Sequence, residues 1–485
     1  MAYSRTPTYN SHQLVRLPVK GSQMLTGSLD IDVGMRYVDC FPRTIKQYAS
    51  DPEHMVVRRP VFESVAVSGY SGTIRGAGNF GTESKFYIVG NALVSQATGT
   101  AVTTLFTNTG YCGVTEAYLG STIYLVVLET HTPSSRLTLW DGATATTIDL
   151  GFYATGDPVF LDGYLFIAEA GTNRIYNSEV GSLTTWTLAN NFIEAEMEGD
   201  TLVTLGKHRN HIVAFGRRTI EFFYNGAIEI GSPLVRQEAY ASYVGHAGEG
   251  VSTYYFTRTC YLGNSLFFFA RVNGSFAICR LEDFKVKIIS DPVLHRIINT
   301  SSSSFLTAKL FPVNCWGSLG LLFGYIESGS TYTWFHYDLE SETWAWWNMV
   351  EGFTPRFHIN ESYFIGNTGA NITVDELISD EDFGGVTLPA TVTFDVFDGG
   401  NDSQKHFKYV DILGSLGTSA ASNSVALYFS KDWEPYTFVE SIEATGSVRF
   451  RNICRARRIS FRVTFSGTAP LHFRGLDVAY NNGVY

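Results

Sequence analysis

The chain has 485 residues, enough for two or three domains with buried cores. Aromatic residues make up 14% of it and charged residues only 17%, and its 46 glycines favour many short strands joined by tight turns. The formal net charge of −11 disfavours a protein that grips nucleic acid through the phosphates, because such proteins are normally basic.

The cysteines and the first residues also exclude several classes of protein. The six cysteines lack CxxC spacing, so we expect reduced, structural thiols and no disulfide framework or zinc site. Residues 1–21 contain no apolar core of a signal peptide, and no apolar run reaches the ~20 residues of a membrane span. We therefore expect a soluble protein that is made in a cytosol.

Residues 1 to about 60 form an irregular, polar lead-in with short extended pieces. Residues 36–42 alternate as a strand does and end at Pro42, and residues 55–60 form a second extended run that ends at Pro60. Neither piece can bury itself alone. We expect this segment to pack on a distant part of the chain, such as a C-terminal platform.

A repeated pattern begins near Val61. Each unit has a turn, an apolar strand, a second turn and a strand that ends in an aromatic residue next to Asp, Asn or Gly. The spacing is roughly 40 to 55 residues and we count about six units, which favours a β-propeller of four-stranded blades. A run of unrelated β-meanders or a β-sandwich is the alternative.

Residues 201–224, TLVTLGKHRNHIVAFGRRTIEFFY, are the clearest stretch of this pattern. Apolar runs of four to six residues, separated by Gly and charged residues, predict three strands of an antiparallel meander. His208 and His211 would suit a metal on a helix, but here a turn separates them. We expect their side chains to point differently and interpret them as turn residues.

The acidic run at residues 374–382 is interpreted as a solvated linker, since it lacks the ligand spacing and central Gly of a calcium loop. After Gly384 the strands are longer and alternate strictly, which predicts a β-sandwich with one buried and one solvated face. We thus predict an all-β chain with an N-terminal segment at 1–60, a propeller at 61–380 and a C-terminal sandwich platform at 381–485.

Two clusters of charged residues remain as candidate sites. Alternation would place Glu194, Glu196 and Glu198, close to Asp200, on one strand face, where a solvated edge or a subunit contact fits better than glycoside cleavage. The second cluster is Arg455, Arg457 and Arg458, which precede one of the last expected strands. We interpret these arginines as the solvated start of that strand rather than as a contact with a subunit or an acidic partner.

No phosphate-binding loop, nucleophile elbow or HExxH motif occurs in the sequence. We therefore predict no catalytic, cofactor-binding or metal-binding residue and no enzymatic activity.

Residues 206–225, GKHRNHIVAFGRRTIEFFYN, resemble the signature of the packaged-DNA-stabilisation proteins of short-tailed bacteriophages. These are tail hub or nozzle proteins that lie below the portal and its adaptor. The matching positions are Gly206, Phe215, Gly216, Thr219, Ile220, Glu221 and Phe222. Residues 37–42, 87–93 and 455–458 resemble further family motifs in the same order. The resemblance is thin between about 280 and 380, and because the loops between blades differ, it assigns no partner-binding residue.

The resemblance implies a hexameric ring attached to the portal adaptor in a virion. Such a hub retains packaged DNA, carries tail spikes or fibres and forms part of the ejection channel. A tail needle is a further partner. A net acidic chain suits a channel wall that DNA passes without binding.

Two other functions stay open. A glycan-binding or glycan-cleaving propeller predicts carboxylates and aromatic residues gathered at one end of the propeller. A kelch-like interaction scaffold is the second alternative.

Overall fold

The computed structural model divides the chain into two compact units. Unit 1 contains Met1–Pro60, His336–Asn348 and Ser379–Tyr485, and unit 2 contains Val61–Phe335 and Met349–Ile378. The structure describes residues 13–19, 36–45, 53–81, 84–103, 110–248, 259–300, 308–328, 331–349, 352–368, 370–378, 388–416, 423–444, 447–468 and 470–482. Each unit is described here by itself.

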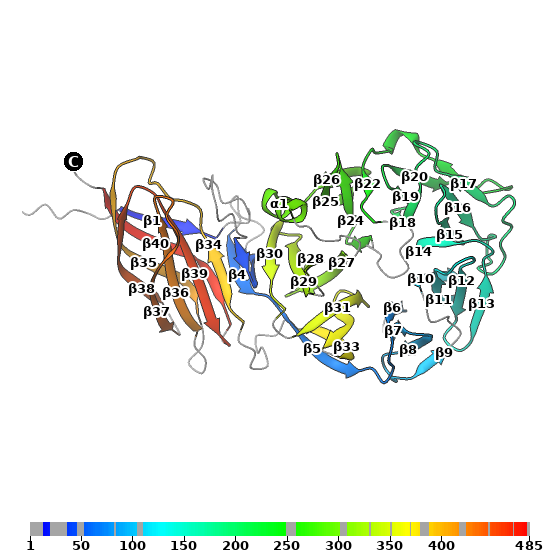
Figure 1. Ribbon diagram of the computed structural model, residues 1–485, viewed down its shortest axis with the longest axis horizontal. Coiled ribbons are helices and arrows are strands. Elements are labelled where there is room, and N and C mark those ends of the chain that lie inside the picture. Colours follow the sequence, from blue (N-terminus) through cyan, green and yellow to red (C-terminus); the bar gives the residue numbers. More distant parts are fainter. Residues whose placement is uncertain are drawn as a thin grey trace, which may run out of the picture. The chain divides into compact units, whose positions relative to one another are not determined.

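Unit 2 consists of seven antiparallel sheets within the described residues (Figure 1). The first sheet contains β6 (Ile74–Phe80), β7 (Ser84–Val89), β8 (Ala92–Ser95) and β9 (Ala101–Thr103), and the second contains β10 (Cys112–Leu119), β11 (Thr122–Glu129), β12 (Arg136–Trp140) and β13 (Ala145–Asp149). The third sheet contains β14 (Ala154–Leu161), β15 (Tyr164–Glu169), β16 (Arg174–Asn177) and β17 (Phe192–Glu194). The fourth contains β18 (Leu202–His208), β19 (His211–Gly216), β20 (Ile220–Asn225) and β21 (Leu234–Arg236). The fifth is β22 (Gly245–His246), β23 (Cys260–Leu262), β24 (Ser265–Val272), β25 (Ser275–Glu282) and β26 (Lys285–Ile288). The sixth is β27 (Lys309–Cys315), β28 (Ser318–Ser328) and β29 (Thr331–Asp338), whose end passes into unit 1, and the seventh is β31 (Phe353–His358), β32 (Tyr363–Thr368), β33 (Asn371–Ile378) and β5 (Val61–Val67).

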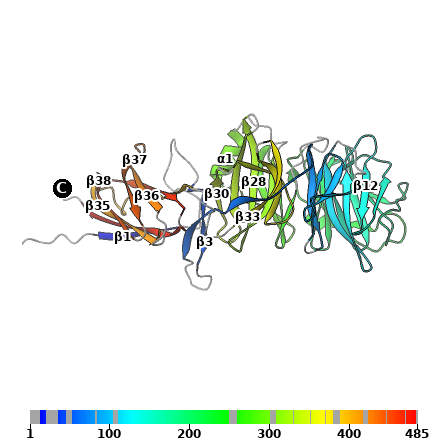
Figure 2. The same cartoon turned by 90° about the horizontal axis from the view of Figure 1, so that it is seen from below.

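The inner strands of these sheets form a closed ring. Strands β6, β10, β14 and β18 contact one another in chain order, β24 and β23 link β18 to β27, and β31 contacts both β27 and β6. Figure 1 shows the sheets arranged around a common axis, and Figure 2 shows the same sheets from the edge of the ring. Unit 2 is therefore a β-propeller in which each sheet is a blade.

The seventh blade is assembled from both ends of the unit. Strand β5 pairs antiparallel with β33, with Val61 opposite Ile378. The Phe62 ring lies 5.0 Å from Phe353 and 5.3 Å from Phe364. The repeats in the sequence indicated about six units, whereas the described residues form seven blades, of which the last is split between two distant stretches of sequence.

The cores of the propeller lie between neighbouring blades. One apolar cluster joins the first and seventh blades through Ile74, Val89 and Ile365, and four similar clusters join other neighbours. Gly76 permits a close approach, since a Cβ there would lie 2.5 Å from the backbone oxygen of Cys112 in the next blade. Burial on both faces explains why these strands read as apolar runs rather than alternating ones.

Unit 1 contains two sheets that pack face to face. One has β3 (Cys40–Thr44), β4 (His54–Arg58), β40 (His472–Asn482), β35 (Lys405–Ser415) and β38 (Val448–Ala456), with β1 (Gln13–Pro18) on β40. The other has β30 (Thr343–Trp347), β2 (Tyr37–Val38), β34 (Ala390–Thr393), β39 (Ile459–Gly467), β36 (Asn423–Lys431) and β37 (Thr437–Ala444). Phe407 packs on Phe461, and Phe473 packs on Phe465, which joins the two sheets in a β-sandwich.

These two units confirm the predicted fold class of a β-propeller with a β-sandwich built from both ends of the chain. His336–Asn348 belongs to unit 1, although the repeat pattern placed it in a propeller unit. The reason is that β30 pairs with β2, with Trp346 opposite Val38. The described residues contain one α-helix, α1 (Pro292–Thr300), and one short 3-10 helix, η1 (Glu238–Tyr240).

The acidic run predicted as a linker begins inside a strand. Residues 374–378 belong to β33, and Asp375 is buried there, so this part is not solvated. The rest of the run, 379–382, lies outside the described residues.

Candidate functional site

A cavity of about 790 Å³ lies among the inner strands of the propeller. It is lined from β6, β10, β14, β18, β23, β24 and β31, so most of the blades contribute to it. Its side chains include the carboxylates of Glu116, Asp157 and Asp162 and the rings of Tyr118 and Tyr261. A volume of this size is typical of a small-molecule site.

Hydrogen bonds hold the carboxylates of the cavity in place. Glu116 accepts hydrogen bonds from the Gly81 backbone N–H at 2.5 Å and from the Tyr118 hydroxyl at 2.6 Å. Asp157 accepts one from the Tyr111 hydroxyl at 2.6 Å. These hydrogen bonds therefore fix the orientation of Glu116 and Asp157.

The cations of the cavity are also held by neighbours. The Lys207 ammonium donates to the Phe160 backbone oxygen at 3.3 Å. Arg209 forms an ion pair with Asp283. The lining thus carries charges of both signs.

The signature stretch of residues 201–224 folds as the predicted meander of β18, β19 and β20. Phe215, Ile220 and Phe222 are completely buried. Gly206 and Gly216 leave room for neighbouring side chains. A Cβ at Gly206 would lie 2.8 Å from the Leu266 side chain, and a Cβ at Gly216 would lie 2.5 Å from a carboxylate oxygen of Asp200. Phe215, Ile220 and Phe222 belong to the apolar cluster that joins the fourth blade to the fifth, and Gly206 lets Leu266 of the fifth blade approach closely.

Glu221 of the signature fixes a neighbouring loop. Its buried carboxylate accepts the Met197 backbone N–H at 3.1 Å and lies 2.9 Å from the Arg236 guanidinium. Burial raises the pKa of Glu221, and the hydrogen bond from Met197 and the charge of Arg236 oppose that rise.

The prediction that His208 and His211 point differently is wrong. They lie directly opposite each other in the β18–β19 hairpin, and such cross-strand neighbours project from the same face. Both rings pack on Phe284, at centroid distances of 5.3 and 4.8 Å. Burial lowers the pKa of both imidazoles.

Among the described residues, no group of three or more His, Cys, Asp or Glu side chains is placed to hold a metal ion. His208 is completely buried and His211 is partly exposed.

The acidic residues near β17 do not lie along one strand face, contrary to the sequence-based expectation. Strand β17 ends at Glu194, and Glu196 and Glu198 follow in an exposed loop. Glu194 pairs with Arg174 at 2.9 Å, and Asp200 accepts the Thr219 backbone N–H at 3.2 Å. The alternation failed as a guide because the chain leaves the sheet after three residues.

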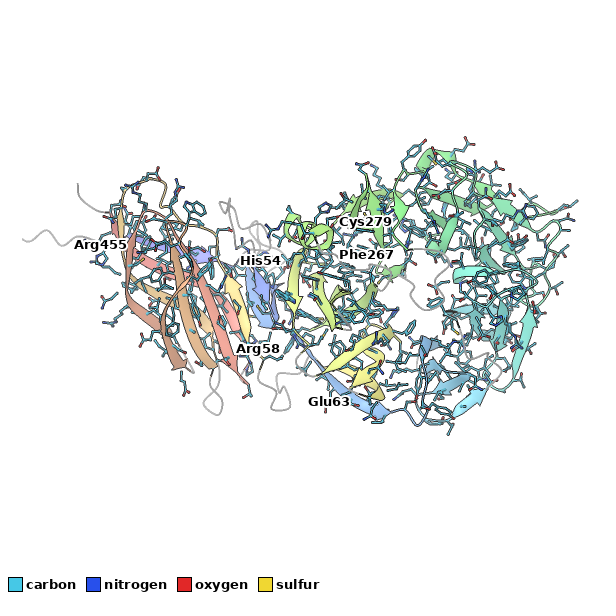
Figure 3. All side chains as sticks on the ribbon, viewed as in Figure 1. His54, Arg58, Glu63, Phe267, Cys279 and Arg455 are labelled. Carbon is cyan, nitrogen blue, oxygen red and sulfur yellow. The ribbon has the colours of Figure 1, made fainter. Side chains whose placement is uncertain are left out.

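The arginines near the C-terminus lie on and beside the edge strand β38, and Arg455 is labelled in Figure 3. Arg449, Arg451 and Arg455 are exposed and lie opposite three residues of β35. Arg449 donates to Asp411 at 2.6 and 2.7 Å, whereas Arg451 and Arg455 have no ion pair among the described residues. The outer face of this sheet therefore has uncompensated positive charge.

The turn after β38 uses the other two arginines of the cluster. The backbone N–H groups of Arg457 and Arg458 both donate to Asp432 at 3.0 Å, and the Arg458 guanidinium pairs with Asp402 at 3.1 Å.

A buried polar cluster in unit 1 was not found from the sequence. The Asp39 carboxylate accepts from Arg59 Nε at 2.9 Å, from the Asn348 backbone N–H at 2.7 Å and from Asn348 Nδ2 at 2.6 Å. Both charged side chains are completely buried, and Asp39 has a left-handed φ of 54°. Burial raises the pKa of Asp39, while Arg59 and Asn348 lower it. The family-like motif at 37–42 was the one available signal.

All six cysteines are free thiols, and burial raises the pKa of Cys279 and Cys454 to about 12. In the part of the chain that is described, no helix is both long and apolar enough to cross a membrane.

The closed ring of blades defines this molecule as a β-propeller protein with a second, sandwich unit. A family model described as bacteriophage P22 Gp10, beta-propeller, matches residues 24–307, more than half of the chain. The chain therefore belongs to this phage stabilisation family, and the resemblance seen in the sequence is confirmed.

Several solved structures are similar to the chain at low identity and low TM-score. The extracellular domain of a one-component system from B. thetaiotaomicron has 10% identity and a TM-score of 0.39, over 88% of this chain and 62% of that one. Kluyveromyces lactis Hsv2 has 10% identity and a TM-score of 0.31, over 69% and 97%. Aleuria aurantia lectin, solved with α-methyl-L-fucoside, has 10% identity and a TM-score of 0.31, over 64% and 93%. No curated protein matches the chain.

Proposed function

We propose that the protein is the hub, or nozzle, of a short phage tail. Six copies form a ring below the portal-adaptor ring, close the DNA exit channel to retain packaged DNA, and form part of the ejection conduit. The hub carries tail spikes or fibres and contacts a tail needle, and it is made in the host cytoplasm before it enters the virion. Membership of the phage stabilisation family is the observation that carries this proposal.

We propose that the propeller spans about residues 61–380 and that residues 1–60 and 381–485 form the platform of the ring. The division into units supports this with one exchange, at His336–Asn348. Ion pairs and buried aromatic clusters inside both units suit a rigid building block. In this proposal the protein has no enzymatic activity, metal or cofactor.

The charge distribution supports passage of DNA without sequence-specific binding. Unit 2 contains 26 acidic and 17 basic residues, so it holds most of the net negative charge. Like charges keep a phosphate backbone from adhering to a wall. The exposed Arg451 and Arg455 of unit 1 are then available for an acidic surface of a subunit or partner.

The oligomeric state of the full chain tests the proposal. We expect native mass spectrometry to give six copies and negative-stain microscopy to show a six-fold ring with an axial hole. The double variant Arg451→Glu/Arg455→Glu should weaken the ring, whereas Arg16→Ala, which affects an exposed residue of the same sheet already paired with Asp477, should leave it intact. A monomer that hydrolyses sugars would overturn the hub.

A further inference from the structure

The axial cavity of the propeller combines aromatic faces with fixed polar groups. Tyr118 and Tyr261 are each 51% exposed, and Phe160 adds a third ring to the lining. Tyr118 cannot rotate freely, because its hydroxyl donates to Glu116 at 2.6 Å. Exposed aromatic faces that are held in place offer flat apolar surface at low entropic cost.

Neutral polar groups lie between these rings. Asn79, Thr115 and Thr259 line the cavity, and their side chains have no hydrogen-bond partner among the described residues. An amide and two hydroxyls can each donate and accept. Glu116 and Asp157 add acceptors.

This composition identifies a class of ligand. A pyranose has apolar C–H faces that pack on aromatic rings, and its edge carries hydroxyls that both donate and accept. Amides, hydroxyls and carboxylates satisfy such an edge. We propose that the axial cavity is a binding site for a neutral oligosaccharide.

Other ligand classes fit the cavity less well. A phosphate or another anion would meet three carboxylates, Glu116, Asp157 and Asp162, against two cations, Lys207 and Arg209, which are already held by neighbours. A metal ion lacks a group of three ligands among the described residues. A wholly apolar ligand would take the remaining lone pairs of these charged carboxylates away from water without replacing the lost hydrogen bonds, which is costly.

The site goes beyond the proposed hub function, which needs no small-ligand site. A tail protein with such a cavity contacts cell-surface sugar directly, in addition to any contact made by spikes or fibres. The sugar of a lipopolysaccharide and that of a capsule share this chemistry, so the experiment has to separate them.

The test uses the purified full chain on an array of bacterial lipopolysaccharide O-chain and capsular oligosaccharides. Binding sugars are then titrated by calorimetry. We expect at least one oligosaccharide to bind, with the O-chain and capsular arms of the array identifying its source. Tyr261→Ala should weaken binding at least about tenfold, while Tyr261→Phe, which keeps the ring, should retain most of it.

The control variant is Tyr243→Ala, because Tyr243 is 70% exposed in the same unit and does not line the cavity. It should bind like the unchanged protein. The inference is overturned if no oligosaccharide binds, if Tyr261→Ala binds normally, or if a peptide or DNA occupies the cavity instead. A six-fold ring without sugar binding would reject the site alone, and a sugar-binding monomer would reject the hub alone.

Discussion

Removal of the Asp39 carboxylate should destabilise unit 1 strongly. Asp39→Ala leaves the Arg59 guanidinium completely buried without its carboxylate, and breaking a buried pair in this way costs about 3–5 kcal/mol. Alanine at a φ of 54° adds about 1 kcal/mol of backbone strain. We therefore expect a loss of about 4–6 kcal/mol. Asp39→Asn tolerates the left-handed backbone, so its loss should be smaller, about 3 kcal/mol.

Hydrogen-exchange mass spectrometry along a urea series checks this prediction, because it follows peptides of each unit separately. Protection should fall in β2, β3 and β30 and stay unchanged in the propeller blades. Arg59→Leu provides the second arm of a double-mutant cycle. The double variant should lose clearly less stability than the sum of the two single variants, since the charges are removed together. A loss below about 1 kcal/mol for Asp39→Ala, or strictly additive effects, would refute the reasoning.

Three further predictions follow from buried groups. Burial lowers the pKa of His246 and His336 to about 3 from 6.5, so only the unfolded chain takes up these protons between those values. The free energy of unfolding should therefore decrease as pH falls below 6.5, by up to about 1.4 kcal/mol per pH unit for each imidazole. In urea titrations, His336→Phe should reduce the difference in stability between pH 7.5 and pH 5. Glu221→Gln should not lower the melting temperature at pH 7, because burial raises the pKa of Glu221 and because its partner Arg236, unlike the completely buried Arg59, is partly exposed and stays hydrated without the carboxylate; a loss of several degrees would contradict this. Phe62→Ala should lower the free energy of unfolding by about 3–5 kcal/mol, and hydrogen-exchange protection should be lost first in β5. Val65→Ala changes an exposed residue of the same strand and should have little effect. Equal effects of the two variants would argue against closure of the seventh blade through Phe62.

Local patterns predicted the strands well because their cause is local. Residues 201–224 became a meander, and the alternating stretches after Gly384 became a sandwich. Burial in a sheet imposes a period on neighbouring residues, and that period is visible in the sequence.

Long-range pairing could not be read in the same way. Residues 336–339 look like other blade ends, yet His336 packs on Trp347 and Phe41 in unit 1. The cavity is lined by residues from Gly78 to His358, and no short sequence motif contains residues so far apart. The Asp39 cluster joins three segments of the chain through Asp39, Arg59 and Asn348. A single Asp between apolar residues does not indicate which residues it will pair with.

Closure of the seventh blade by β5 also sets the order of events during synthesis. Val61 is made about 320 residues before Ile378, its partner in the sheet. At about 5–20 residues per second, β5 waits roughly 15–60 s with its apolar side chains unpaired. The seventh blade therefore forms only after the other six blades have been made, and an unpaired strand edge in that interval is a point where nascent chains can associate wrongly. Translation speed and chaperone access should consequently influence the yield of this protein more than the stability of any single blade.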